Sequence, residues 1–530
     1  MGTKKSSLQL PSSHLRIAAR QSDLARLQAE TVAAHIQEKF PNLKIELNFR
    51  ASLGDQNQHD PLWKMPEKGV FTEDFYSDLV NEKVDIVVHS WKDLPIESKP
   101  DTRIVATMKR ADQRDLFLFK RSHKKSVQES GCLKVLTSSP RRSYNLESFF
   151  KNYFPYKIRQ TQFLNVRGNI PTRLKKLFSE DVDGLIVAKA ALDRLLSTND
   201  SQYLNVQNEM SALLKECQWM CLPLSENPSA AAQGALAIEA KNNSPWLEML
   251  AEIHDEQTFK SVECERKILA HYGGGCHQKI GVSVLARTFG ELQFLRGLTD
   301  QGEVLDSIRL ISSEEFPKAA HREKIYPDPA SLTQQNLFQR EKKTVSQIGD
   351  ALKDSFLWVT REDALPDDFR PDTHQILWTS GLKTWQKIAA RGIWVNGSAE
   401  SLGESEDSRI DVIVQASSSG EALSAQRASP IAWTKLTHET GFANPNMKIV
   451  LTYALRPQAA CSNLDLGQKT HFYWSSGSNF DFCTERFPEI RNAWHFCGPG
   501  HTFDHLKKCL GSHAKLRICL NYEDWLQKVL

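Results

Sequence analysis

The sequence has no long apolar run. No stretch approaches the roughly 20 apolar residues that a membrane span needs, and residues 1–13 are polar, without the apolar core of a signal peptide. We therefore expect a cytoplasmic protein that has no membrane partner.

A strong charge of one sign is also lacking. The 67 Lys and Arg residues nearly balance the 64 Asp and Glu residues, which leaves a formal net charge of +3. This balance argues against nucleic acid as the partner of the whole chain, although basic side chains can still gather in one cleft. The 530 residues are enough for roughly three or four compact domains.

Closely spaced cysteines are absent too. The ten cysteines include no C-x-x-C pair, so we expect neither a bound metal nor a redox motif, and most thiols should be reduced and buried. Cys276 differs from the others, because Gly273, Gly274, Gly275 and His277 surround it and would present its thiol.

Residues 14–240 carry alternating extended and helical patterns, which are typical of parallel α/β units. Leu15–Ala19 and Lys44–Ser52 are predicted strands, and Ser22 can cap the helix between them. Residues 245–310 form a smaller predicted α+β segment. Residues 312–347 are charged and contain proline, which indicates a linker before a second α/β body that extends to Leu530.

Polar side chains follow several predicted strands. Asp93 comes after Asp85–His89, and Arg141 and Arg142 come after Lys134–Thr137. Ligands of open α/β sheets bind at the carboxyl ends of the strands, and guanidinium groups match carboxylates as two-pronged donors. The pattern predicts a receptor for a polycarboxylate, whereas the pair Arg141 and Arg142 taken alone would fit a solvated helix start.

Six motifs, in order, resemble the porphobilinogen deaminase family over residues 14–310. They are Arg16–Ser22, His89–Pro95, Thr137–Arg142, Arg167–Asn169, Gln233–Gly234 and Gly274–Cys276. The resemblance implies a two-lobed, periplasmic-binding-protein-like α/β fold with a small α+β third domain. We expect domain 1 in residues 14–108 plus 222–240, domain 2 in residues 109–221, and the cysteine-bearing domain 3 in residues 241–311.

This family couples four porphobilinogens head to tail, with release of ammonia each time, on a dipyrromethane primer that a cysteine holds as a thioether. Cys276 matches that cysteine, and Asp93 matches the catalytic aspartate that stabilises positive charge on the pyrrole nitrogens. The resemblance implies a hydroxymethylbilane synthase that takes porphobilinogen as its substrate, and we favour a monomer.

The remaining matches are ligand-binding positions. Those implied for the cofactor, besides Cys276, are Lys92, Thr137, Ser138, Ser139, Arg141, Arg142, Arg167, Gly168 and Ala188. Those implied for the substrate are Arg20, Ser22, Arg173, Arg194 and Gln233. The chain departs from the family at Ala232, where glycine is usual, and at Pro66–Gly69, which replaces a glycine-rich stretch before the lid lysine.

Residues 348–530 resemble uroporphyrinogen-III synthase, which cyclises hydroxymethylbilane with inversion of its last ring. The resemblance rests on Val359–Arg361, Tyr473–Ser478 and Cys497–Pro499, and it suggests functional roles for Tyr453, Ser476 and Thr502. Two alternatives remain at this stage. The first is a non-catalytic two-lobed anion-binding protein, which would have no use for the Cys276 thiol, and the second is a deaminase with an inactive C-terminal appendage.

Overall fold

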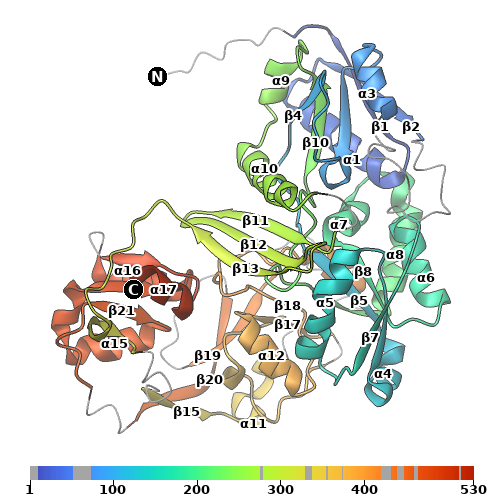
Figure 1. Cartoon of the computed structure of the whole chain (residues 1–530). Coiled ribbons are helices and arrows are strands. Elements are labelled where there is room, and N and C mark those ends of the chain that lie inside the picture. Colours follow the sequence, from blue (N-terminus) through green and yellow to red (C-terminus); the bar gives the residue numbers. More distant parts are fainter. Residues whose placement is uncertain are drawn as a thin grey trace.

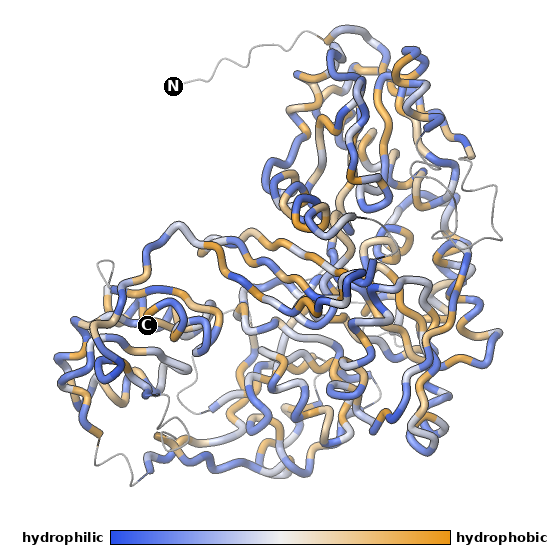
Figure 2. Tube along the Cα trace, in the orientation of Figure 1, coloured by the Kyte–Doolittle hydropathy of each residue, from blue (hydrophilic) through white to orange (hydrophobic). Residues whose placement is uncertain are grey.

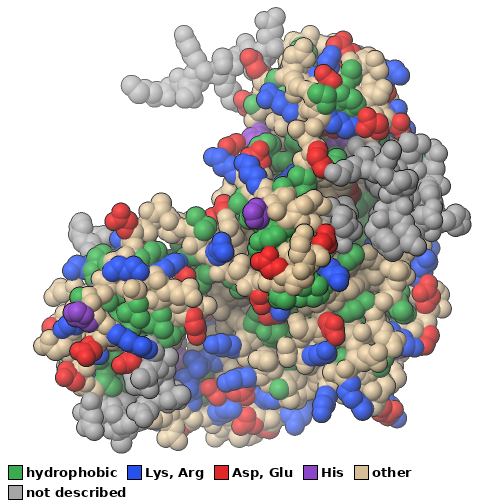
Figure 3. All heavy atoms as spheres, in the orientation of Figure 1, with side chains coloured by type: hydrophobic (Ala, Val, Ile, Leu, Met, Phe, Trp, Pro, Cys, Tyr) green, Lys and Arg blue, Asp and Glu red, His purple; other side chains and the backbone are tan. Residues whose placement is uncertain are grey.

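The computed structural model describes residues 10–51, 73–274, 278–328, 337–353, 356–372, 374–418, 431–438, 447–458, 464–511 and 515–530. Within these ranges, none of the helices combines the length and the apolar character of a membrane span. Acidic and basic side chains are interspersed over the face shown in Figure 3, as the small net charge leads one to expect.

The first lobe is a five-stranded mixed sheet in the order β2-β1-β3-β10-β4 (Figure 1). Its strands are β1 (His14–Arg20), β2 (Lys44–Arg50), β3 (Ile86–Ser90), β4 (Thr102–Ala106) and β10 (Leu236–Lys241). Helices α1 (Asp23–Lys39) and α3 (Glu73–Val80) pack against it. Leu15, Ile17 and Ala19 alternate into the core of this lobe, where they meet Val32 and Ile36 of α1.

The second lobe is a five-stranded sheet in the order β7-β6-β8-β5-β9. Its strands are β5 (Asp115–Lys120), β6 (Cys132–Leu136), β7 (Gln160–Leu164), β8 (Gly184–Ala188) and β9 (Cys217–Cys221). Its helices are α4 (Lys124–Ser130), α5 (Pro140–Tyr153), α6 (Ile170–Ser179), α7 (Lys189–Ser197) and α8 (Leu204–Lys215).

The sequence patterns predict parallel sheets, but each of the two sheets also contains antiparallel pairs. β10 runs antiparallel to β3 and β4, and β5 runs antiparallel to β8 and β9. The cause is the connection between the lobes: the chain leaves the first sheet after β4 to enter β5, and it returns after β9 to enter β10. Residues 107–114 and 222–235 are therefore two side-by-side crossings, here called the outward and return crossings.

A third, smaller unit follows the return to the first lobe. It contains α9 (Leu247–Ala251), α10 (Glu256–His271) and an antiparallel sheet of β11 (Gly281–Arg287), β12 (Gly290–Leu298) and β13 (Val304–Ile311). This is the predicted α+β segment. The domain boundaries given above remain predictions.

The C-terminal body has two sheets. The strand order of the larger sheet is β15-β20-β19-β16-β17-β18. Its strands are β15 (Phe338–Lys342), β16 (Phe356–Val359), β17 (Ile376–Thr379), β18 (Gly397–Ser398), β19 (Trp433–His438) and β20 (Met447–Pro457). The helices of this part are α11 (Val345–Ile348), α12 (Leu382–Ala390) and α13 (Asp411–Ser417). The smaller contains β14 (Ile325–Tyr326), β21 (His471–Trp474), β22 (Trp494–Cys497) and β23 (Leu516–Ile518), with α15 (Gly477–Arg486), α16 (His501–Leu510) and α17 (Tyr522–Val529).

The prediction of a plain linker over residues 312–347 is wrong in part. β14 pairs in parallel with β21, and β15 pairs antiparallel with β20, so this segment supplies a strand to each C-terminal sheet. In β15 the single apolar residue Phe338 is followed by four polar or charged residues, and only every second side chain is exposed, so a search for apolar runs does not find the strand.

The larger C-terminal sheet and the second lobe share continuous hydrophobic cores. The rings of Phe119 and Trp394 are 5.6 Å apart, and those of Phe149 and Trp385 are 5.5 Å apart. Trp394 Nε1 also donates to the carbonyl of Trp219 at 2.9 Å. Figure 2 shows apolar segments in both parts, and buried side chains of both belong to the same clusters, so the second lobe and the larger C-terminal sheet form one packed body.

Candidate functional site

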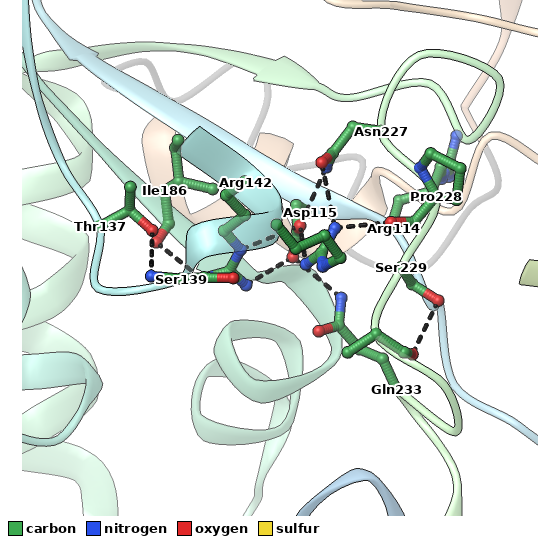
Figure 4. A network of polar contacts seen from close by, with 12 residues as sticks. Arg114, Asp115, Thr137, Ser139, Arg142, Ile186, Asn227, Pro228, Ser229 and Gln233 are labelled. Atoms are coloured by element: carbon green, nitrogen blue, oxygen red, sulfur yellow. Dashed lines mark hydrogen bonds and ion pairs between the residues drawn. The ribbon is translucent and has the colours of Figure 1, made fainter. Parts of the chain in front are cut away.

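A buried carboxylate organises the region where the chain crosses between the lobes. Asp115, the first residue of β5, accepts hydrogen bonds from Arg141 Nη2 at 2.8 Å and from Arg142 Nη2 at 2.6 Å. Asn227 Nδ2 and Gln233 Nε2 donate to it at 3.0 and 2.9 Å. Figure 4 shows Arg142 of α5 and Asn227 and Gln233 of the return crossing converging on Asp115.

The charges in this network do not cancel. Burial alone would raise the pKa of Asp115, but Arg142 and Arg141 hold it well below its usual range. Asp115 is therefore an anion that faces two buried guanidinium groups. The network keeps an excess positive charge at the start of α5.

A second cationic position lies at the end of β3, in the turn Trp91–Asp93. Lys92 Nζ donates to Gln233 Oε1 at 3.3 Å, so Gln233 connects Lys92 to Asp115. Burial lowers the pKa of Lys92, and the charge of Asp93 counteracts this effect. Asp93 itself is exposed at the end of the turn.

Arg173 on α6 lies close enough to Arg142 and Asp93 for their charges to affect its pKa. Its Nε donates to the carbonyl of Gly168 at 2.7 Å. Burial, together with the positive charges of Arg142 and Arg167, lowers the pKa of Arg173 to about 10, against the opposing charge of Asp93. The structure thus brings these predicted residues into one electrostatic environment, where negative ligand groups would relieve the repulsion between the arginines.

The predicted hydroxyl residues fix the loops that carry these arginines. Ser138 Oγ donates to the Val166 carbonyl at 2.7 Å and accepts from Val166 N at 2.9 Å, which ties the loop after β6 to the loop after β7. Ser139 N donates to Thr137 Oγ1 at 3.3 Å. Gly168 has φ of +111°, and a Cβ there would lie 2.8 Å from Thr172, so this turn requires glycine.

Three more predicted residues lie at element ends, and a fourth lies on α7. Arg20 ends β1, and Ser22 precedes α1 at the expected cap position, although its hydroxyl makes no capping hydrogen bond. Ala188 ends β8. Arg194 on α7 donates to the carbonyl of Gly234 at 2.8 Å, so it holds the return crossing.

The predicted cofactor cysteine, Cys276, lies outside the described residues, as do Gly275, His277 and the stretch Pro66–Gly69. The preceding residue Gly274 is described, with φ of +62°, and a Cβ there would lie 2.6 Å from Ile96. Arg266 of α10 also donates to the carbonyls of Leu94 and Pro95. The segment that leads to Cys276 therefore packs on the loop that follows Asp93.

The sequence analysis missed two buried acids. Asp115 directly precedes the apolar run Leu116–Phe119, a place where a charge needs a partner. Glu265 accepts from Arg110 Nη1 and Nη2 at 2.7 and 2.8 Å, from Ala232 N and from Val284 N. Glu265 thereby joins α10, both crossings and β11.

A separate basic group surrounds Tyr453 in the C-terminal body. Tyr453 is buried, and its ring lies 5.5 Å from that of His438. Burial lowers the pKa of His438 to about 4, helped by the charges of Lys435, Arg340, Arg361 and His501. Arg340 and Lys435 lie on strands of the larger C-terminal sheet, Arg361 follows its strand β16, and His501 begins α16 beside the smaller sheet.

Thr502 follows His501 in the first turn of α16, so it belongs to the region of the basic group. Ser476 instead caps α15, where its Oγ accepts from Asn479 N at 3.3 Å. Among the described hydrogen bonds, none joins Ser476 to Tyr453.

Comparison with known proteins gives consistent results for the first three units. Residues 15–248 match a family model described as "Porphobilinogen deaminase, dipyromethane cofactor binding domain". The porphobilinogen deaminase of Caldicellulosiruptor saccharolyticus is 32% identical over 308 residues, which cover 58% of this chain and 92% of the relative. That of Burkholderia orbicola is 32% identical over 306 residues, covering 58% and 82%.

Two solved structures show a distant likeness to this chain. A putative periplasmic sulfonate-binding protein, SsuA from Methylobacillus flagellatus, matches with a TM-score of 0.25 and 14% identity over 48% of this chain and 69% of its own. The effector-binding domain of BenM with its effector benzoate matches with a TM-score of 0.24 and 14% identity, over 49% and 93%.

Proposed function

The chain belongs to the porphobilinogen deaminase family and is a hydroxymethylbilane synthase of tetrapyrrole biosynthesis, and we propose how its residues divide the work. Porphobilinogen is the substrate, and a dipyrromethane is the cofactor. The bound dipyrromethane supplies the primer to which the monomers are added. In our proposal Cys276 holds it through a thioether, Asp93 is the catalytic carboxylate, and the arginines bind the acetate and propionate groups.

The observation that carries this assignment is the position of Asp93 within an excess of positive charge. The positive charges of Arg142 and Arg167 repel that of Arg173, and the negative charge of Asp93 counteracts this repulsion. Carboxylates of the oligopyrrole would be held by these cations, together with Lys92. This charge pattern fits a polycarboxylate cofactor.

Asp93 has a distinct role because it is the exposed acid at the end of β3. Departure of ammonia leaves positive charge on a pyrrole nitrogen, and a carboxylate beside it stabilises that charge and accepts the proton released when the new carbon–carbon bond forms. The close approach of Gly274 to Ile96 supports this role, since it brings the end of the described segment before Cys276 next to the loop that follows Asp93.

Two variants test the assignment. Intact mass should show a dipyrrole-sized excess on the wild-type chain and none on Cys276→Ala. Asp93→Asn should keep the adduct when loaded with preformed tetrapyrrole yet lose turnover by about 100-fold or more, because the geometry remains while the stabilising charge is gone. A bare wild-type chain would refute the role of Cys276, and near-normal turnover of Asp93→Asn would refute that of Asp93.

The match of Asp93 to the catalytic aspartate supports this assignment over a passive anion receptor, which would have no use for that carboxylate, and turnover of porphobilinogen separates the two directly. We further propose that the enzyme acts as a monomer in the cytoplasm and binds neither nucleic acid nor membranes. Size-exclusion chromatography with light scattering tests the monomer: a dimer mass at micromolar concentration would contradict it.

A second activity, cyclisation of hydroxymethylbilane to uroporphyrinogen III, is proposed for the C-terminal body. The supporting observation is the basic group around Tyr453, because the substrate carries many carboxylates and the group brings Arg340, Arg361 and Lys435 together near His501 of α16. Burial and the nearby Arg340 lower the pKa of Arg361, as expected for a cation that lacks full compensation. Tyr453 would then contact the ring that is inverted.

The test uses the full chain, because the C-terminal body shares its core with the second lobe. Asp93→Asn, given fresh hydroxymethylbilane, should yield the type III isomer. Adding Tyr453→Phe or Arg361→Gln should shift the product toward type I, which forms without an enzyme. Exclusive type I product from Asp93→Asn alone would leave the C-terminal body as an inactive appendage.

A further inference from the structure

Three side chains with metal-binding chemistry meet between α15 and α16. They are Asp481 of α15 and His505 and Cys509 of α16, and one donor atom of each lies within 4.8 Å of the others. None belongs to the site described above. His505 and Cys509 are four residues apart on one helix, so their side chains project from the same face.

The donor geometry fits a tetrahedral ion. His505 Nε2 lies 3.7 Å from Cys509 Sγ and 2.7 Å from Asp481 Oδ1. Zinc bound to one sulfur, one nitrogen and one oxygen separates the donors by roughly 3.3–3.7 Å. The His505–Cys509 distance already meets this value, and the Asp481 side chain, which is 45% exposed, can retreat to make room.

The imidazole of His505 is positioned in advance. A Cβ on Gly477 would lie 2.6 Å from His505 Cδ2, so the glycine makes space for the ring. Phe480 contacts the ring edge-on, with centroids 6.2 Å apart. These contacts hold Nε2 toward both Asp481 and Cys509 in the absence of any ion.

The same geometry argues against a Cys-His-Asp nucleophile. In such a triad the two ring nitrogens divide the work, one accepting the thiol proton and the other donating to the acid. Here Nε2 alone faces both partners. Convergence of three donors on one point is the arrangement of a metal site.

We propose that Asp481, His505 and Cys509 bind a zinc ion. Mixed nitrogen, sulfur and carboxylate ligands suit zinc, and water completes the coordination on the exposed side of Asp481. The thiol proton of Cys509 leaves to solvent when the thiolate binds. The ion clamps α15 to α16 and so fixes the helix starts that carry Ser476 and Thr502.

Cobalt(II) is the probe, because tetrahedral cobalt bound to a thiolate gives intense visible bands and a near-ultraviolet charge-transfer band. The chelator-treated full chain should show both on titration, and zinc should abolish them. Cys509→Ser should lose the charge-transfer band and weaken binding by about tenfold or more, since even groups that only support a ligand contribute that much.

Cys132→Ser is the matched control, because Cys132 is also a partly buried thiol but lies on β6; it should keep both bands. Asp481→Asn, a change at a partly exposed side chain, guards against misfolding of the other variants and should weaken binding without loss of the charge-transfer band. Weak octahedral bands from the wild type, or an unchanged spectrum from Cys509→Ser, would overturn the proposal.

Discussion

At the scale of single residues, Asp115 determines whether the arginine pair can exist where it does. Arg141 and Arg142 are only 4% and 7% exposed, and burying two like charges without a counter-ion is unfavourable by several kcal/mol. The shared carboxylate offsets this repulsion and also orients both guanidinium groups.

Asp115→Asn should therefore destabilise the protein far more than an isosteric change usually does. The amide keeps the shape but leaves two buried cations without a counter-charge, which we expect to lower the unfolding free energy by about 3–5 kcal/mol. The effect is measured as the midpoint of denaturant unfolding, with deaminase activity as the signal of the folded state. Asp181→Asn removes an ion pair with Lys134 in which Asp181 is 85% exposed, and its midpoint should barely move; equal midpoints for the two variants would contradict the role of Asp115.

The arginines could be predicted from the sequence, but their partner could not. Arg141 and Arg142 stand in a recognisable motif just after a predicted strand. Asp115 lies 26 and 27 residues away in the chain, and only the pairing of β5 with β8 brings it to the start of α5. Ala232 was noted as a departure from glycine, and its φ of +65° shows why glycine is usual there.

At the scale of elements, Glu265 anchors α10 to the crossings. Glu265 is fully buried and ion-paired with Arg110. Its other acceptor bonds, to Ala232 N and Val284 N, attach the return crossing and β11. The helix that leads toward Cys276 is thus held by one carboxylate.

Glu265→Gln should loosen α10 selectively. The amide cannot form both charge-assisted bonds to Arg110, so amide hydrogen exchange in α10 should accelerate by about tenfold or more, for a loss of at least ~1.4 kcal/mol. Glu263→Gln, on the same helix with a side chain 46% exposed and paired only with Lys267, is the control. Unchanged exchange in Glu265→Gln would mean that packing alone fixes the helix.

Element existence followed from the sequence more readily than strand direction did. Gly184–Ala188 is a strand over the predicted residues, and β1 and α1 lie where the apolar spacing placed them. The antiparallel β5 and β10 were missed because direction depends on which lobe the chain enters, and hydrophobic spacing does not encode that.

At the scale of the whole molecule, the shared core makes the stability of the deaminase depend on the folding of the C-terminal body. Arg114 of the outward crossing adds to this, since it pairs with Asp112, donates to the Ser408 carbonyl at 2.6 Å and lies over the ring of Trp378. The crossing is thus tied to the C-terminal body as well as to the lobes.

Trp394→Ala should therefore make deaminase activity less stable to heat, although Trp394 lies in the C-terminal body, outside the deaminase units. Removing a buried tryptophan from a packed core costs about 3–5 kcal/mol, so deaminase activity should be lost at a lower temperature during heating. Trp525→Ala is the control, because Trp525 is fully buried in the smaller C-terminal sheet among residues of that unit alone. A wild-type inactivation temperature for Trp394→Ala would show that the two parts unfold independently.

Because of the common core, misfolding of the C-terminal half in a living cell also removes the deaminase half. A damaging substitution anywhere in the larger C-terminal sheet raises the fraction of misfolded chains that proteases remove, and it lowers the amount of deaminase without touching its catalytic groups. Inherited loss of haem-pathway flux could then map to the rear half of the gene even where that half catalyses nothing.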